Sequence, residues 1–205
     1  MCELLDRYFR KSSALVLEGL FSDMEVEEKQ KFIIKILKLD NEGKRSDLVE
    51  AFLDKADMDT ITMFFKTGNT KLLYNHSEEL EGEKRNVYRD IKGSYKDQRL
   101  VCRIFKLYQK GNQMAIQISN QDGRKGKTGT VHPTGKNNNT MTFYLSFPEY
   151  ARLIARAERY TLKRELQHSI TKSEPYIEPQ IFNQTEPHTN LKKEDNNVKR
   201  FSWAE

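Results

Sequence analysis

The sequence has few of the residues that disulfide-bonded and metal-bound domains need. It contains two cysteines, Cys2 and Cys102, which are far apart and show no CxxC spacing. This excludes a disulfide framework and a cysteine zinc site, and we predict no metal and no other cofactor. No apolar run approaches the ~18 residues of a membrane span, and the first residues lack the basic and apolar regions of a secretion signal. We therefore expect a location in the cytoplasm, or in the nucleus of a eukaryote.

Patterns of common catalytic sites are also missing. The histidines are scattered, and no Ser-His-Asp, HExxH or paired-carboxylate arrangement is visible. The loop Gly123–Gly129 contains Gly-Lys-Thr, as a phosphate-binding P-loop does, but Gln121 stands where that motif needs its first glycine. Glycines and Pro133 follow the loop instead of a helix. We therefore predict that the protein is not an enzyme.

Acidic residues are almost absent between Gln98 and Pro148. This segment holds eight basic residues and one acid, Asp122, whereas the whole chain has a net charge of +5. Residues 1–97 hold 17 basic and 20 acidic residues, and residues 173–205 hold 4 and 6. A basic segment between acidic ones indicates a surface for a polyanion such as a nucleic acid.

The first third of the chain predicts helices. Apolar residues recur at spacings of three and four over residues 4–20 and again over residues 32–39, as they do on one face of a helix. Residues 41–44 interrupt the pattern. Residues 46–53 and 61–65 predict two more helices, the last ending at Gly68-Asn69. We expect residues 1–74 to form a helical bundle for protein contact or dimerisation.

The pattern changes along the middle of the chain. Residues 75–97 are a run of charge with little to bury and predict a linker. From Gln98 the apolar period shifts toward two and predicts strands around residues 100–107, 114–119 and 140–145, with a weaker one around 128–132. Gly111 at the first central position of Lys110–Gln113 favours a tight hairpin. The expected fold class is α+β: the helical bundle, followed by a basic antiparallel sheet with a helix over residues 98–172.

The helix of this second part has a clear start. Ser146-Phe147-Pro148-Glu149 matches a capping box with proline in the first turn, and we expect the helix to run to about His168. Residues 173–205 hold three of the five prolines and few apolar residues. They predict a disordered tail, in which Phe201 and Trp203 could form a docking peptide.

Basic and aromatic residues of the predicted sheet are the candidate binding residues. Bases of a single strand stack on aromatic rings while cations meet the phosphates, and a glycine-rich loop lets backbone amides and lysines approach phosphates. For the individual aromatics, the alternative is a place in the core beneath the helix. The candidates are Arg103, Phe105, Lys106, Tyr108, Arg124, Lys125, Lys127, Lys136 and Tyr144.

In the stretch Asn139–Tyr150 a predicted strand passes directly into the capped helix, and a loop rich in lysine and glycine, Gly123–Gly126, precedes it. This layout of residues 98–168 resembles single-stranded-DNA-binding proteins of the transcriptional-coactivator and Whirly type. The resemblance implies a curved four-stranded antiparallel sheet, a long helix after it, and dimerisation through the helices. The same stretch is similar to ribbon-helix-helix operator binders, but those need one strand followed by two helices.

We therefore expect a nucleic-acid-binding protein that prefers single-stranded DNA or RNA and has little sequence preference. The alternatives are a regulator that binds duplex DNA and a non-enzymatic interaction or scaffold protein. A protein partner could bind helices within residues 1–74 or the C-terminal tail, and the chain could form a homodimer. No membrane partner is expected.

Overall fold

A computed structural model describes residues 2–96, 99–136 and 138–173. Within it, residues up to Ser173 form one compact unit. The predicted disordered tail, apart from Ser173, lies outside the described residues.

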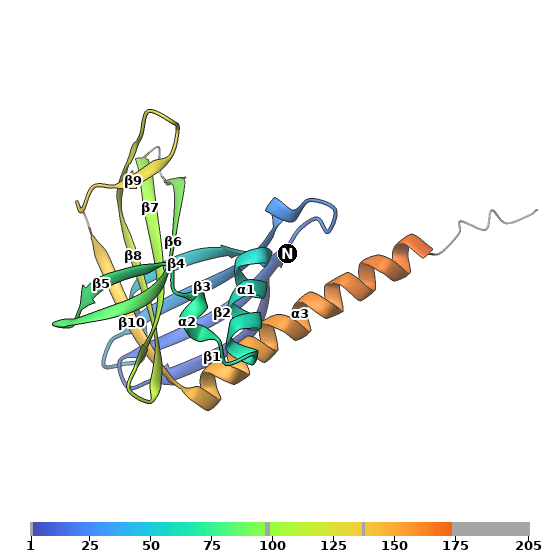
Figure 1. The fold of residues 1–205 in the computed structure, drawn as a ribbon, viewed down its shortest axis with the longest axis horizontal. Helices are drawn as coiled ribbons and strands as arrows, with labels where there is room; N and C mark the ends of the chain where they lie inside the picture. Colours follow the sequence, from blue (N-terminus) through green and yellow to red (C-terminus); the bar gives the residue numbers. More distant parts are fainter. Residues whose placement is uncertain (1, 97–98, 137, 174–205) are drawn as a thin grey trace, which may run out of the picture. The chain divides into compact units, whose positions relative to one another are not determined.

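The chain begins with a four-stranded antiparallel sheet, not with a helical bundle (Figure 1). Its strands lie in sequence order: β1 (Glu3–Arg10), β2 (Ser13–Phe21), β3 (Gln30–Leu39) and β4 (Arg45–Asp54). A 3₁₀ turn, Glu27–Lys29, precedes β3. The prediction of a bundle over residues 1–74 is therefore wrong. Helices in this region are α1 (Lys55–Lys66), which includes the predicted helix at residues 61–65, and the one-turn α2 (Thr70–Leu73).

The first sheet has apolar residues on both faces, which explains the error. In β2, Leu15, Leu17 and Phe21 are buried on one face, while Val16 and Leu20 are half-buried on the other. Adjacent apolar residues then fall at spacings of three and four along the sequence, as they do in a helix. The alternation of apolar and polar residues, which identifies a strand with one solvent-exposed face, is therefore lost.

A second antiparallel sheet has the strand order β10-β8-β7-β6-β5. The charged stretch 75–97, predicted as a linker, contains two of its strands, and the strands predicted after Gln98 are present. Lys110 and Gln113 face each other across the predicted hairpin, in which Gly111 has a φ of +54°. The strands are β5 (His76–Leu80), β6 (Glu83–Lys96), β7 (Arg99–Lys110), β8 (Gln113–Lys125) and β10 (Asn139–Ser146), and the short β9 (Val131–Pro133) pairs with β8.

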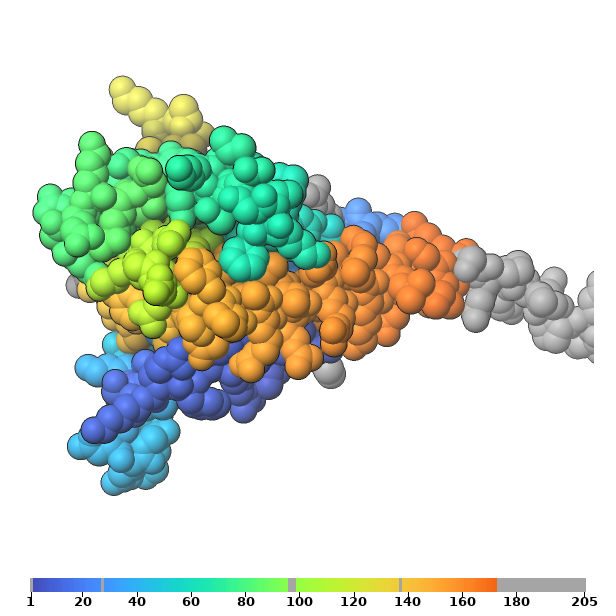
Figure 2. Space-filling view, turned by 60° about the horizontal axis from the view of Figure 1, so that its bottom comes forward, coloured from blue at the N-terminus to red at the C-terminus, as the bar shows by residue number. Residues whose placement is uncertain are grey.

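The long helix α3 (Phe147–Ser173) joins the two sheets into one core. Its start is the predicted capping box, in which Glu149 accepts hydrogen bonds from the Ser146 amide at 2.8 Å and the Ser146 hydroxyl at 2.9 Å. Figure 2 shows α3 between α1 and the first strands. The buried cluster combines Leu17 and Phe32 of the first sheet, Phe105 of the second and Tyr160 of α3. Four neighbouring antiparallel strands followed by a helix thus occur twice: β1–β4 with α1, and β6, β7, β8 and β10, with β9 inserted before β10, with α3.

Candidate nucleic-acid interface

The basic loop, residues 124–136, comprises the last two residues of β8, β9 and the connections around it, and ends shortly before β10. It projects at one end of the second sheet (Figures 1 and 2). Its tip is closed by two backbone hydrogen bonds, from Gly126 N to Thr130 O at 2.7 Å and from Gly129 N to Gly126 O at 3.0 Å. Gly129 has a φ of +83°, a conformation that other residues rarely adopt. The loop is therefore an ordered hairpin.

Glycines of the sheet allow β9 to lie directly on its surface. A Cβ added to Gly93 of β6 would be 2.2 Å from a methyl carbon of Val131, and one added to Gly123 of β8 would be 2.8 Å from the other methyl. The close approach holds Val131 against two strands that are not neighbours in the sheet. The glycines thus fix the base of the basic loop.

Side chains of this end of the sheet are positively charged and exposed. Within the parts of the chain that the structure describes, none of them is in an ion pair, and residues 123–139 contain no acid. Arg99 of β7 belongs with the loop residues. Val101 of β7 is paired with Asp122 of β8; Arg99 lies two residues before Val101 and Arg124 two residues after Asp122, so the two arginines are opposite each other. We call these residues the cationic tip: Arg99, Arg124, Lys125, Lys127 and Lys136.

An exposed aromatic ring, absent from the predicted set, lies at the same end of the sheet. Tyr95 of β6 is opposite Leu100 and is 71% exposed. It is two residues from Gly93 and therefore lies on the face of the sheet that β9 covers. Sequence reasoning missed Tyr95 because the surrounding charge indicated a linker; its signal was an aromatic residue among basic ones.

Two of the cations predicted to bind phosphates form ion pairs with acidic residues of the fold instead. Arg103 is buried, bonds Glu50 of β4 at 3.2 Å and Ser94 of β6, and lies 5.0 Å from the centre of the Phe52 ring. Lys106 bonds Glu78 of β5 at 2.6 Å. Both therefore hold parts of the fold together and are not available to phosphates. The structure separates them from the four predicted loop cations, which it brings together.

The predicted stacking rings are not at the cationic tip. Phe105 is 3% exposed in the main core, and Tyr108 is fully buried with Leu80, Val87 and Ala115. Tyr144 packs beside this smaller cluster, and its hydroxyl donates to Glu81. Burial raises the pKa of Tyr144 and of Tyr108. For Phe105 and Tyr108, the alternative of a core position is therefore the one observed.

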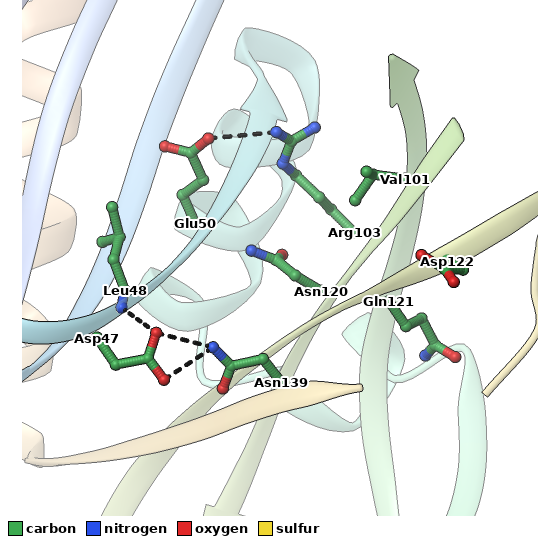
Figure 3. A pocket seen from close by; sticks show the side chains of 9 residues that line it. All are labelled: Asp47, Leu48, Glu50, Val101, Arg103, Asn120, Gln121, Asp122 and Asn139. Carbon is green, nitrogen blue, oxygen red and sulfur yellow. Dashed lines mark hydrogen bonds and ion pairs between the residues drawn. The ribbon is translucent and has the colours of Figure 1, made fainter. Parts of the chain in front are cut away.

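A polar cleft of about 310 Å³ opens beside the cationic tip, between β4 and the strands β7, β8 and β10 (Figure 3). Asp47 accepts two hydrogen bonds from the amide of Asn139, both at 3.0 Å, and Arg103 and Glu50 close one side. Within the described residues, Asn120 Oδ1 and Arg103 Nε are buried and have no hydrogen-bond partner. The polar cleft is lined by Asp47, Leu48, Glu50, Val101, Arg103, Asn120, Gln121, Asp122 and Asn139.

Comparison with known proteins found no matching family model and no match among curated proteins. In the described part of the chain, no group of three or more His, Cys, Asp or Glu side chains is arranged to hold a metal ion. None of the described helices combines the length and apolar character needed to cross a membrane.

Proposed function

We propose that the protein binds single-stranded DNA or RNA through the cationic tip and the ring of Tyr95. The observation that carries this proposal is the charge of the tip. Its basic side chains are exposed and have no acidic partners among the described residues, whereas Arg103, Lys106 and Lys110 of the same sheet are all in ion pairs. Cations that neutralise the phosphates of a nucleic acid release the counterions condensed on it, and this release favours binding.

The geometry favours a single strand over a duplex. Readers of duplex DNA commonly place a helix in the major groove, but the first half of α3 is buried through Tyr150, Leu153 and Ala157. The cations here lie on a hairpin loop and on the strand ends beside it, at the end of the sheet that also carries Tyr95; along the strands, Arg99 and Arg124 lie on the face opposite that ring. That combination can follow a flexible backbone while a base stacks on the ring. Phosphate contacts and ring stacking do not read the edges of the bases, so the tip and the ring by themselves supply little sequence preference.

Fluorescence anisotropy with labelled single-stranded DNA, single-stranded RNA and duplex DNA of equal length, at two salt concentrations, tests the proposal. We expect both single strands to bind more tightly than the duplex and affinity to fall as salt rises. Binding that does not change with salt contradicts the proposal. A duplex preferred at one short sequence supports the regulator alternative, and no retention of any nucleic acid supports the scaffold alternative.

A further inference from the structure

The polar cleft contains buried polar atoms that the fold leaves without partners. The side chain of Arg103 is 9% exposed, and its Nε has no acceptor among the described residues. Asn120 Oδ1, on the neighbouring strand, has no donor. Figure 3 shows Asn120 extending from β8 toward β4, between Arg103 and Asn139. A buried polar atom without a partner destabilises a fold, so water or a ligand that supplies one acceptor and one or more donors would stabilise this pair of side chains.

The charges around the cleft limit what that ligand can be. Among the residues that line the cleft, Asp47, Glu50 and Asp122 are acidic and Arg103 is basic, and Arg103 already bonds Glu50, so the cleft disfavours a phosphate. Its volume of about 310 Å³ is at the small end of the range for ligand pockets. An uncharged, planar group with N–H donors fits these properties better than an anion does.

Phosphate-binding residues lie at the rim of the cleft. Arg124 follows Asp122 by two residues on β8. The carbonyl of Lys136 accepts a hydrogen bond from the Asp122 amide at 3.0 Å, and Gly135 N donates to Gln121 Oε1 at 2.6 Å. These bonds hold one end of the basic loop against the wall of the cleft. A nucleotide can therefore place its phosphate on the tip and its base in the cleft.

We infer that the polar cleft binds one nucleobase that carries an exocyclic amino group. This inference rests on the proposed function, because the base belongs to a strand whose phosphates lie on the cationic tip. An asparagine amide pairs with an amino group and the adjacent ring nitrogen of adenine, and a carboxylate such as Glu50 accepts from the amino group of cytosine. Uracil carries a carbonyl oxygen in place of the amino group, which Asn120 Oδ1 and Glu50 repel, and its ring N–H is then its one donor to these side chains.

Oligo-dC and oligo-dU of equal length test the inference, because their bases have nearly the same size and differ at the edge that the cleft would contact. We expect the full-length protein to bind oligo-dC about tenfold more tightly, the effect of one good side-chain–base pair. Asn120→Leu should reduce this ratio to about one without lowering the melting temperature, since Asn120 Oδ1 gives up no bond within the described structure. Asn86→Leu makes the same change on the exposed part of β6 and should keep the ratio.

The outcomes separate the two proposals. Equal binding of both oligonucleotides with a normal salt dependence overturns the base-binding cleft and leaves the proposed function standing. A ratio that Asn120→Leu does not change also overturns it. No binding of either oligonucleotide ends the proposed function itself. If Asn120→Leu does not fold, Asn120→Ala provides the same comparison with less bulk.

Discussion

Gly93 is the position at which one added carbon atom should displace the basic loop. In Gly93→Ala the new Cβ would lie 2.2 Å from one Val131 methyl carbon and 2.5 Å from its Cβ, so something must move. Overpacking a rigid site costs about 1–3 kcal/mol. β9, however, has three residues, and releasing half-buried Val131 costs about 1 kcal/mol of lost apolar burial. Releasing Val131 costs less free energy than overpacking the site, so we expect β9 to detach from the sheet.

A double-mutant cycle measured by urea unfolding tests this reasoning. Gly93→Ala and Val131→Ala should each lower the free energy of unfolding by about 1 kcal/mol. The double variant should lose little more than either single variant, because β9 is already released. Gly93→Ala should also weaken single-strand binding. Single effects that simply add, or a Gly93→Ala protein as stable as the wild type, would refute the close contact.

The remaining predictions concern single side chains. Arg103→Met should lower the free energy of unfolding by about 2 kcal/mol, because it leaves the partly buried Glu50 without its cation, and should not change the salt dependence of binding. Tyr95→Ala should weaken binding about tenfold through lost stacking and leave the melting temperature unchanged, since the ring is exposed. The bond from Arg10, at 2.7 Å, together with the two bonds from Ser146, lowers the pKa of Glu149 from 4.5 to about 2. A depressed carboxylate pKa stabilises the fold above the unfolded value and loses that effect as pH falls. The melting temperatures of wild type and Glu149→Gln should therefore differ at neutral pH and converge as the pH falls from 4.5 toward 2.

The second half of the fold could be predicted from the sequence, and the first could not. The hairpin at Gly111 and the capping box at Ser146 depend on local chemistry that the sequence states directly. In β2 and β3 the apolar residues are set by tertiary contacts on both faces, and adjacent pairs such as Ile33 and Ile34 hide the period of two. Strands β5 and β6 carry many charged residues, and their charge indicated a linker. The ion pairs that accommodate these charges, such as Lys106 with Glu78, form only once the sheet is assembled.

The candidate site was predictable in part for the same reason. The loop cations are adjacent in sequence and exposed, so composition alone located them. Arg103 and Phe105 share a face of β7, as alternation predicts. That face packs against the first sheet, and the prediction of a helical bundle over residues 1–74 included no such sheet. The polar cleft needed coordinates, because Glu50 and Asn120 come from different sheets.

The central claim is that the lysines of the basic loop contact phosphates, and the slope of log affinity against log salt tests it most directly. With the cationic tip fully engaged, we expect a slope of about −3.5 for a single strand. Lys125→Gln/Lys127→Gln should reduce it to about −2. The control Lys71→Gln/Lys84→Gln, which removes the same charge from exposed positions on α2 and β6, should leave it unchanged. Equal slopes for the two double variants would contradict the account.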